Sequence, residues 1–289
     1  MIVLCLYFLS LFASLNTNYE NGNNYAYSNE SPAQTLNITL SQSATNTKRQ
    51  PAILILQDSS KTNKKINNLI WQNALKNGYA AIVITYRDAE KYPFPAQIQD
   101  VNAAIRWIKK FGHKLNIAPD KLFIFGAAEG GYLAALQGVT ATYIAGVTAI
   151  IEFGSNSAIM QAQENEQKNQ NYVELFNSNQ INKNTNVIGV IDFYGDLDNP
   201  KKYYTPINYI TPLSPPFIMV YGENSTTTAK DYVTTFYQTL KNSTCPAGTK
   251  NCYTKLIRIK NSEHNNELFY NQMLIDTVFN YINEILLEK

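Results

Sequence analysis

The residues with the clearest chemical signature form a turn between an apolar strand and a helix. Leu122 to Phe125 are four consecutive large apolar residues, which predict a strand buried on both faces of a parallel sheet. The turn that follows reads Gly126-x-Ala128-x-Gly130, and a helix is predicted to begin by Tyr132. In a G-x-S-x-G turn of this kind, the central serine can attack a carbonyl carbon. Here the central position is Ala128, whose methyl group cannot do so.

The chain has two histidines, His113 and His264. His264 lies in Ser262-Glu263-His264-Asn265, directly after a predicted strand, and one interpretation of it is an exposed loop histidine. His113 follows a predicted helix and is interpreted as a solvated C-terminal residue. The two histidines and the loop carboxylates show no metal-ligand spacing, so no metal site is predicted.

Strands and helices alternate along the chain around this turn. This alternation predicts an α/β fold: one domain with a mostly parallel central sheet and helices on both faces. Residues 141–152 are apolar without a clear period and either extend the helix after the turn or add a strand. The other predicted strands are 52–56, 80–85, 187–193, 217–220 and 255–259, and the other predicted helices are 66–75, 98–108, 228–241 and 267–287.

The ends and one insertion define the domain organisation. Residues 1–15 form an apolar run that is too short to span a bilayer, and they predict a signal peptide and hence a secreted or periplasmic protein. The run has no preceding Lys or Arg, and the alternative is that the chain begins within a longer protein. Residues 16–48 are an Asn/Ser-rich, mostly flexible lead-in with a short edge strand at 36–40. Residues 49–289 form the domain, in which 155–186 read as a polar insertion or lid.

The cysteines agree with export. Cys5 lies in the apolar leader, whereas Cys245 and Cys252 enclose a turn-rich spacer of six residues. Such a spacer lets the two thiols meet, so we predict a disulfide in an oxidising compartment. The alternative is a pair of free thiols in an exposed loop.

The bulk composition excludes some partners. A hydrophobic content of 45% is that of an ordinary globular protein, and a net charge of +2 with scattered basic residues gives no basic stripe. We therefore expect no nucleic-acid partner and no stable membrane span. The composition identifies no protein partner.

Three segments carry a family resemblance. Tyr86 to Ala96, with Asp100 beyond it, resembles the YRLAPExPFPA-x-x-x-D segment of the esterase/lipase branch of the α/β-hydrolases, the hormone-sensitive-lipase-like and carboxylesterase group. Ile117 to Lys121 is similar to the loop before that family's elbow strand, and Asp192 to Asp198 is similar to its DFYGPTD strand end. The resemblance runs from about residue 51 to residue 289. It implies ester hydrolysis through an acyl-enzyme, with no cofactor.

The resemblance also assigns the catalytic positions. Ala128 occupies the nucleophile position, and His264 occupies the position of the base. The acid belongs at the fourth residue of the Gly222-Glu223-Asn224-Ser225 turn, so Ser225 replaces an aspartate there. Glu223 or Asp198 could substitute as the acid, although each is also typical of a solvated loop.

The oxyanion hole of this family is framed by an HGG or HGGG loop. Here the corresponding positions are Gln57 and Asp58, so the glycines that let amide groups face the substrate oxygen are missing. The second donor, the amide of Glu129 at the head of the helix, is retained by its position.

Together these changes favour an exported α/β-hydrolase-fold protein of the carboxylic ester hydrolase type that is catalytically dead. One alternative is an active serine esterase carrying a Ser-to-Ala replacement. The additional losses at Ser225 and in the oxyanion loop argue against it, because a deliberate knockout changes one residue. The other alternative is a non-catalytic ligand-binding or scaffold protein, since a fold does not fix a function. A small acyl ester or an apolar ligand is the expected binding partner.

Overall fold

The computed structural model describes residues 22–42, 49–58, 63–153, 184–197, 205–225, 230–245 and 252–288. The proposed signal peptide at 1–15 lies outside the described residues, as do most of the proposed insertion at 155–186 and Asp198.

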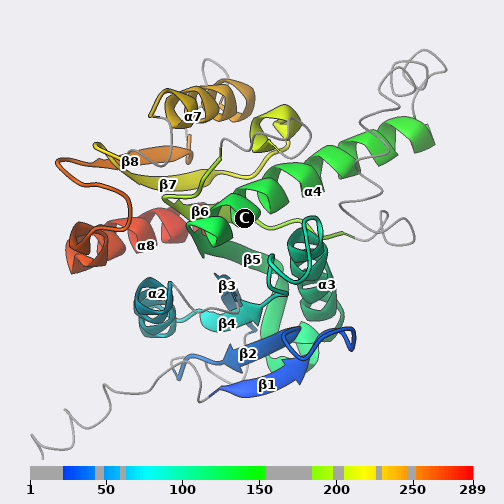
Figure 1. The fold of residues 1–289 in the computed structure, drawn as a ribbon. Coiled ribbons are helices and arrows are strands. Elements are labelled where there is room, and N and C mark those ends of the chain that lie inside the picture. The colour runs from blue at the N-terminus through cyan, green and yellow to red at the C-terminus, as the bar shows by residue number, and fades with distance from the viewer. Residues whose placement is uncertain are drawn as a thin grey trace, which may run out of the picture.

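A single eight-stranded sheet runs through the described part of the chain (Figure 1), in the order β1-β2-β4-β3-β5-β6-β7-β8. β2 pairs antiparallel with both β1 and β4, whereas the pairs from β4 to β8 are parallel. The α/β fold with a mostly parallel sheet is therefore confirmed. The strands are β1 (Asn23–Ala26), β2 (Thr35–Thr39), β3 (Gln50–Gln57), β4 (Ala80–Thr85), β5 (Ile117–Ala127), β6 (Gly189–Phe193), β7 (Phe217–Gly222) and β8 (Lys255–Ile259).

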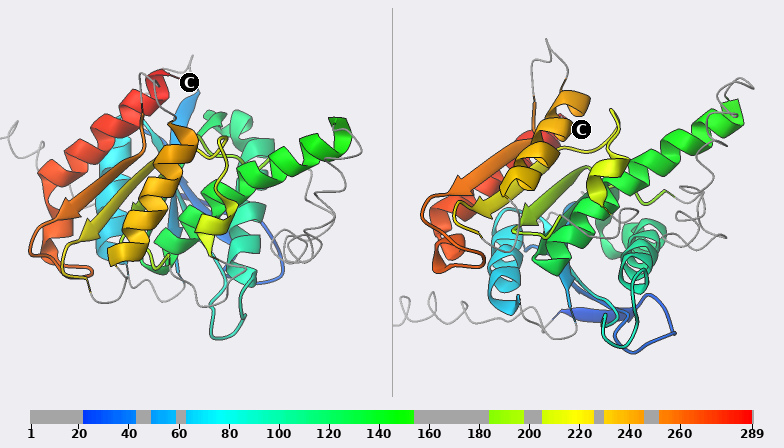
Figure 2. Two further views of the ribbon diagram at one scale, coloured as in Figure 1. Left: turned by 90° about the horizontal axis from the view of Figure 1, so that it is seen from above. Right: turned by 45° about the horizontal axis from the view of Figure 1, so that its top comes forward.

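Helices cover both faces of this sheet. Figures 1 and 2 show α2 and α8 on one face, and α3, α4 and α7 on the other. Because the strands of a parallel sheet must be joined by crossovers, each connection can place a helix over a face. The helices are α2 (Lys64–Lys76), α3 (Ala96–Phe111), α4 (Glu129–Phe153), α7 (Lys230–Thr244) and α8 (Gln272–Leu287), with short 3₁₀ turns η2 (Gly112–Leu115), η5 (Pro206–Tyr209) and η6 (Glu267–Tyr270).

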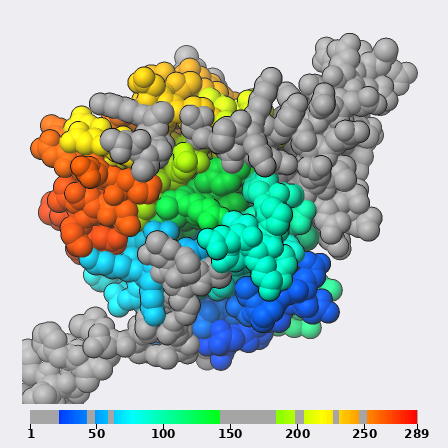
Figure 3. Space-filling view, viewed as in Figure 1, coloured from blue at the N-terminus to red at the C-terminus, as the bar shows by residue number. Residues whose placement is uncertain are grey.

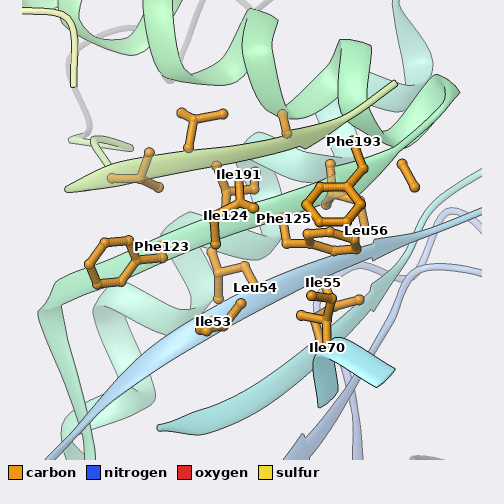
Figure 4. Close-up of a cluster of buried hydrophobic side chains, with 14 of the residues drawn as sticks. Ile53, Leu54, Ile55, Leu56, Ile70, Phe123, Ile124, Phe125, Ile191 and Phe193 are labelled. Atoms are coloured by element: carbon orange, nitrogen blue, oxygen red, sulfur yellow. The ribbon is translucent and has the colours of Figure 1, made fainter. Parts of the chain in front are cut away.

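The core lies at the central strands β3, β5 and β6 (Figure 4). Leu122 to Phe125 are all fully buried, as the absence of polar alternation predicted. Phe125 packs edge-on against Phe193 of β6, with ring centroids 5.4 Å apart. On the same face of the sheet, α2 presents the buried side chain of Ile70 beside that of Ile55 on β3, which is the register partner of Phe125.

Two elements differ from their predicted extents. The apolar run after the turn extends the helix rather than adding a strand, because α4 continues from Glu129 to Phe153. The predicted helix over 267–287 is instead divided into η6 and α8. Asn271 separates them in an extended conformation, and its side chain caps α8 by accepting a hydrogen bond from the amide of Met273.

The lead-in differs from its prediction within residues 22–42. The edge strand expected at 36–40 is present as β2, but β1 also pairs with it and extends the sheet. Leu36 and Ile38 alternate toward the core and are 0% and 4% exposed. The Asn37 amide group between them bonds to the carbonyl of Gly22 and to Asn24. Polar composition concealed this strand pair, because its side chains pair with one another.

Cys245 and Cys252 form a disulfide with a Cα–Cα distance of 5.5 Å. The bond joins the residue after α7 to a residue just before β8. Among the described residues, no helix is both long and apolar enough to cross a membrane.

Candidate active site

Ala128 stands alone between a strand and a helix. β5 ends at Ala127 and α4 begins at Glu129, and Ala128 adopts a left-handed conformation with φ of 52°. Its carbonyl accepts the first helical hydrogen bond from the amide of Tyr132, and its own amide donates to the carbonyl of Phe193 on the neighbouring strand. The sequence therefore builds a sharp strand–turn–helix elbow, as predicted, with a methyl group at its tip.

Two glycines are required for the tightness of the elbow. A Cβ on Gly126 would overlap the carbonyl group of Gly130, one helical turn away across the bend. A Cβ on Gly131 would overlap the carboxylate of Asp192 and the backbone of Gly195. The first turn of α4 can therefore pack directly onto the end of β6.

His264 lies in the loop after β8, beside the end of β6. Its ring is half-buried and packs edge-on against Tyr194, with centroids 4.9 Å apart. Because Tyr194 follows the residue that holds the Ala128 amide, this contact connects the histidine to the elbow. Burial lowers the pKa of His264, and the negative charge of Asp196 opposes that shift. The imidazole is thus held in its neutral, basic form at neutral pH.

The acid turn contacts the histidine loop but supplies no partner for the ring. The amide of Asn224 donates to the carbonyl of Ser262, so the two loops are joined by backbone. Nδ1 of His264 is nevertheless buried with no hydrogen-bond partner in the described part of the chain. Neither Glu223 nor Ser225 bonds to it. Within the described residues, the structure therefore joins the acid turn to the histidine loop without a carboxylate bonded to Nδ1 of His264.

Asp196 was not among the candidates from the sequence. It is an exposed residue two positions before Asp198, and its charge acts on His264. The signal was present in the segment Asp192 to Asp198, but sequence spacing does not show which of its acids faces the loop after β8.

Gln57 and Asp58 end β3 at the oxyanion position. The Gln57 side chain is buried, and its Oε1 accepts a hydrogen bond of 2.8 Å from Asn67 of α2. Its Nε2 donates to the Asp58 carbonyl, so the side chain fixes the strand end. The Gln57 side chain thus links the end of β3 to α2.

Negative charge gathers around the first residue of α4. Limited hydration raises the pKa of Glu129, and the charges of Asp58 and Asp88 raise it further. Burial, followed by the charges of Glu129 and Asp58, also raises the pKa of Tyr86. The Tyr86 hydroxyl is buried and has no hydrogen-bond partner among the described residues. The electrostatics at this position therefore oppose a developing oxyanion.

A clamp positions the loop that carries Asp88. The buried carboxylate of Asp100 accepts hydrogen bonds from the backbone amide and the guanidinium of Arg87, with an ion-pair distance of 2.7 Å. Nε2 of Gln34 donates a further hydrogen bond of 2.7 Å to this carboxylate. Asp100 thus holds the Tyr86–Ala96 segment, which carries the family resemblance, beside the elbow. Figure 3 shows α4 (green) at the centre of this face, between the α2 region (cyan) and the Tyr86–Ala96 segment with α3 (teal).

Asp192 lies against Gly131 in the first turn of α4 and so supports the elbow. It was not identified as a site residue from the sequence. Its carboxylate is fully buried, and it accepts bonds of 2.6 Å from the Tyr221 hydroxyl and 3.0 Å from the Gly195 amide. Burial raises the pKa of Asp192 to about 7, although these bonds act in the opposite direction. This group sets the turn that carries Tyr194 toward His264.

His113 lies away from the site, exposed in η2 at the end of α3. Among the described residues, no cluster of three or more His, Cys, Asp or Glu side chains could hold a metal ion.

Residues 52–240, more than half of the chain, match the model of the BD-FAE family, a hormone-sensitive-lipase-like esterase family. The chain belongs to the BD-FAE family. The match includes the elbow and the acid turn, and the esterase/lipase-type α/β-hydrolase assignment is therefore shown. The family resemblance seen in the sequence is confirmed.

Proteins with similar sequences are named as lipases or esterases. Lipase 2 of Moraxella sp. (strain TA144) is 34% identical over 61 residues, which are 21% of this chain and 14% of that protein. Esterase LipQ of Mycobacterium tuberculosis is 27% identical over 153 residues, which are 50% of this chain and 34% of that protein. The matched segments thus span only a minor part of these relatives.

Solved structures share the fold. A truncated carbohydrate esterase from gut microbiota has a TM-score of 0.67 at 19% identity, with 92% of this chain and 97% of that chain covered. The apo form of Thermogutta terrifontis esterase 2 has a TM-score of 0.69 at 15% identity, with 93% and 96% covered. At these identities the likeness concerns the fold alone.

Proposed function

We propose that this chain is a non-catalytic member of its esterase family, in which the elbow site binds a ligand without hydrolysing it. The observation that carries the proposal is the pairing of a retained elbow with a lost nucleophile. Ala128 keeps the left-handed backbone that presents a serine hydroxyl, but its methyl group cannot form an acyl-enzyme.

Two further features support this reading. His264 would be the base, yet no described carboxylate bonds to its Nδ1 to orient it. At the oxyanion position, Asp58 adds negative charge beside Glu129, where a working site needs donors. A site that had lost only its serine would retain both parts.

The expected ligand is a small acyl ester or another apolar molecule. The half-buried ring of His264 packs against the buried ring of Tyr194 beside the end of β6, so an uncharged ligand could contact the exposed side of the imidazole there. We also propose that the protein is exported, on the apolar run at residues 1–15 and on the disulfide between Cys245 and Cys252.

A second candidate is a working serine esterase in which Ala128 replaces the serine. The retained elbow and the position of His264 favour it. In this case Glu223, Asp196 or Asp198 would supply the acid once a nucleophile was present. A scaffold role is a third candidate. In that case we expect the elbow site to bind no ligand.

Restoring the nucleophile separates these candidates. We expect Ala128→Ser to stay near background on short acyl esters, because loss of the orienting acid costs about 10⁴-fold and loss of one oxyanion donor about 10²–10³-fold in serine hydrolases. Adding Ser225→Asp should produce the first measurable turnover. The matched control is Ser225→Asp alone, which lacks a nucleophile and should be inactive.

Turnover of about 1–10³ per second from Ala128→Ser alone would contradict the non-catalytic proposal. Binding is measured separately, by titrating a non-hydrolysable ester analogue into the unchanged protein. Binding of the analogue supports a ligand-binding role, which the Ala128→Ser result separates from the working esterase, whereas absence of binding favours the scaffold.

A further inference from the structure

A pocket lies beside the last turns of α3. It is open to solvent, has a volume of about 680 Å³, and is lined by Arg106, Trp107, Lys110 and Phe111. α3 follows the carboxyl end of β4 and leads back to β5, so its last turns lie toward the amino ends of the strands. The pocket is lined by residues of α3, by Tyr27 after β1 and by Asn184, and it shares no lining residue with the elbow around Ala128.

Arg106 carries a charge that no described residue neutralises. Its Nη1 is buried without a hydrogen-bond partner in the described chain, and burial alone lowers the pKa of the guanidinium there. An arginine side chain remains protonated in proteins even so. Because a desolvated charge without a counter-charge is destabilising, an anion at this position would be bound favourably.

Two lysines add to the positive charge of the wall. Nζ of Lys109 donates to the carbonyl of Pro119 at 3.1 Å, which holds this side chain along the pocket. Nζ of Lys110 lies 5.1 Å from the centre of the Phe111 ring. Lysines alone are common on surfaces, but here they flank a half-buried guanidinium.

Three aromatic residues, with Ala103 and Asn184, form the rest of the wall. The Trp107 ring lies 5.0 Å from that of Phe111 and 5.3 Å from that of Tyr25. The hydroxyl of Tyr27, which also lines the pocket, donates to the carbonyl of Thr85 at 2.8 Å, so its ring is fixed. These rings offer a flat apolar body a place beside the cations.

We propose that this pocket binds a small organic anion, with its oxyanion group on Arg106 and its flat apolar body against Trp107 and Phe111. A carboxylate fits the guanidinium best, because its two oxygens match two parallel N–H donors. The site is separate from the elbow, so the proposal does not depend on whether the chain is catalytic.

The two tryptophans of the chain make the test local. Benzoate, benzamide and inorganic phosphate are titrated into the ¹⁵N-labelled full chain while the two indole N–H signals are followed. Benzoate should shift the Trp107 signal and leave that of Trp71, which is buried against the core, unchanged. Benzamide lacks the charge and phosphate lacks the apolar body, so each should bind at least tenfold more weakly.

Arg106→Gln should weaken benzoate binding at least tenfold, whereas Arg49→Gln makes the same change at an exposed position and should have no effect. Arg106→Lys keeps the positive charge but loses the two parallel N–H donors of the guanidinium, so it should give an intermediate affinity for benzoate. Equal binding by Arg106→Gln would overturn the proposal, as would equal binding of benzoate and benzamide, phosphate binding as tight as benzoate, or no shift at Trp107. The ligand comparison uses the unchanged chain, so it decides the matter even if a variant fails to fold.

Discussion

At the elbow, φ of 52° at Ala128 is a conformation that costs roughly 1–2 kcal/mol for a residue other than glycine. The surrounding contacts maintain it, because the Ala128 amide is held by Phe193 and its carbonyl starts α4. The backbone of the site therefore does not depend on the serine. Loss of the nucleophile leaves a formed elbow, which is why a ligand-binding role is compatible with it.

Asp192 is the residue whose ionisation should affect stability most directly. Its folded pKa of about 7 lies above the ordinary value of 3.8, so the folded chain binds more protons than the unfolded chain between these two values. Its contribution to stability is therefore fully present below pH 4 and is lost as the pH rises toward and through 7. The slope is at most about 1.4 kcal/mol per pH unit.

Asp192→Asn should remove that dependence. An asparagine can donate its amide to the Tyr221 oxygen, while the Tyr221 hydroxyl keeps its 2.8 Å bond to the Gly195 carbonyl. The free energy of unfolding, measured by urea denaturation from pH 4 to pH 8, should therefore fall more in the unchanged protein than in the variant. Parallel pH profiles would show that Asp192 is ionised throughout.

At the scale of elements, the elbow requires the first turn of α4 to pack closely against the end of β6. Gly131 lies at the closest point, where any side chain would meet Asp192 and Gly195. Gly130, its neighbour in the same helix, has only Leu56 within contact range of an added Cβ, at 3.4 Å. The two adjacent glycines thus serve different purposes, and they form a matched pair.

Gly131→Ala should destabilise the protein by about 1–3 kcal/mol, because the helix must move off the sheet. Gly130→Ala should be neutral, or stabilising by up to about 1 kcal/mol, because alanine favours the helix. Thermal or urea unfolding of both variants measures the difference. Equal effects in the two variants would mean that the helix start can shift without cost.

For the whole molecule, the disulfide ties the end of α7 to β8 at the edge of the sheet. Cys245 and Cys252 are seven positions apart, so the bond closes a small loop. In the chain-entropy model a loop of this size contributes about 2.5 kcal/mol.

Cys245→Ser combined with Cys252→Ser should therefore lower the free energy of unfolding by about 2 kcal/mol under oxidising conditions. Reductant should destabilise the unchanged protein by a similar amount and have no effect on the double variant. Thiol titration of the unfolded, oxidised chain should detect Cys5 alone when residues 1–15 are retained, and no thiol in the exported protein from which they have been removed. Detection of three thiols would contradict the bond.

The sequence alone determined the α/β architecture and the elbow, because buried strands, helical stripes and turn glycines leave local patterns. The family was indicated by the resemblance of three segments, among them Tyr86 to Ala96 and Asp192 to Asp198, to those of known esterases. The hydrophobic runs of the sequence gave β5 and the central strands their places in the core. It missed β1, because polar residues that pair with each other look like those of a solvated loop.

Only the tertiary structure decided which distant groups act on each other. Asp196 lies near His264, and Asp192 lies against Gly131. Negative charges from distant segments also gather around Glu129. Sequence spacing does not show these contacts, because it does not show which side chains of distant segments face each other. The unneutralised charge of Arg106 is of the same kind, since the amphipathic pattern of α3 places it on a helix without showing what surrounds it. Burial and charge proximity are properties of the packed chain, and they set the pKa values and the binding chemistry of these groups.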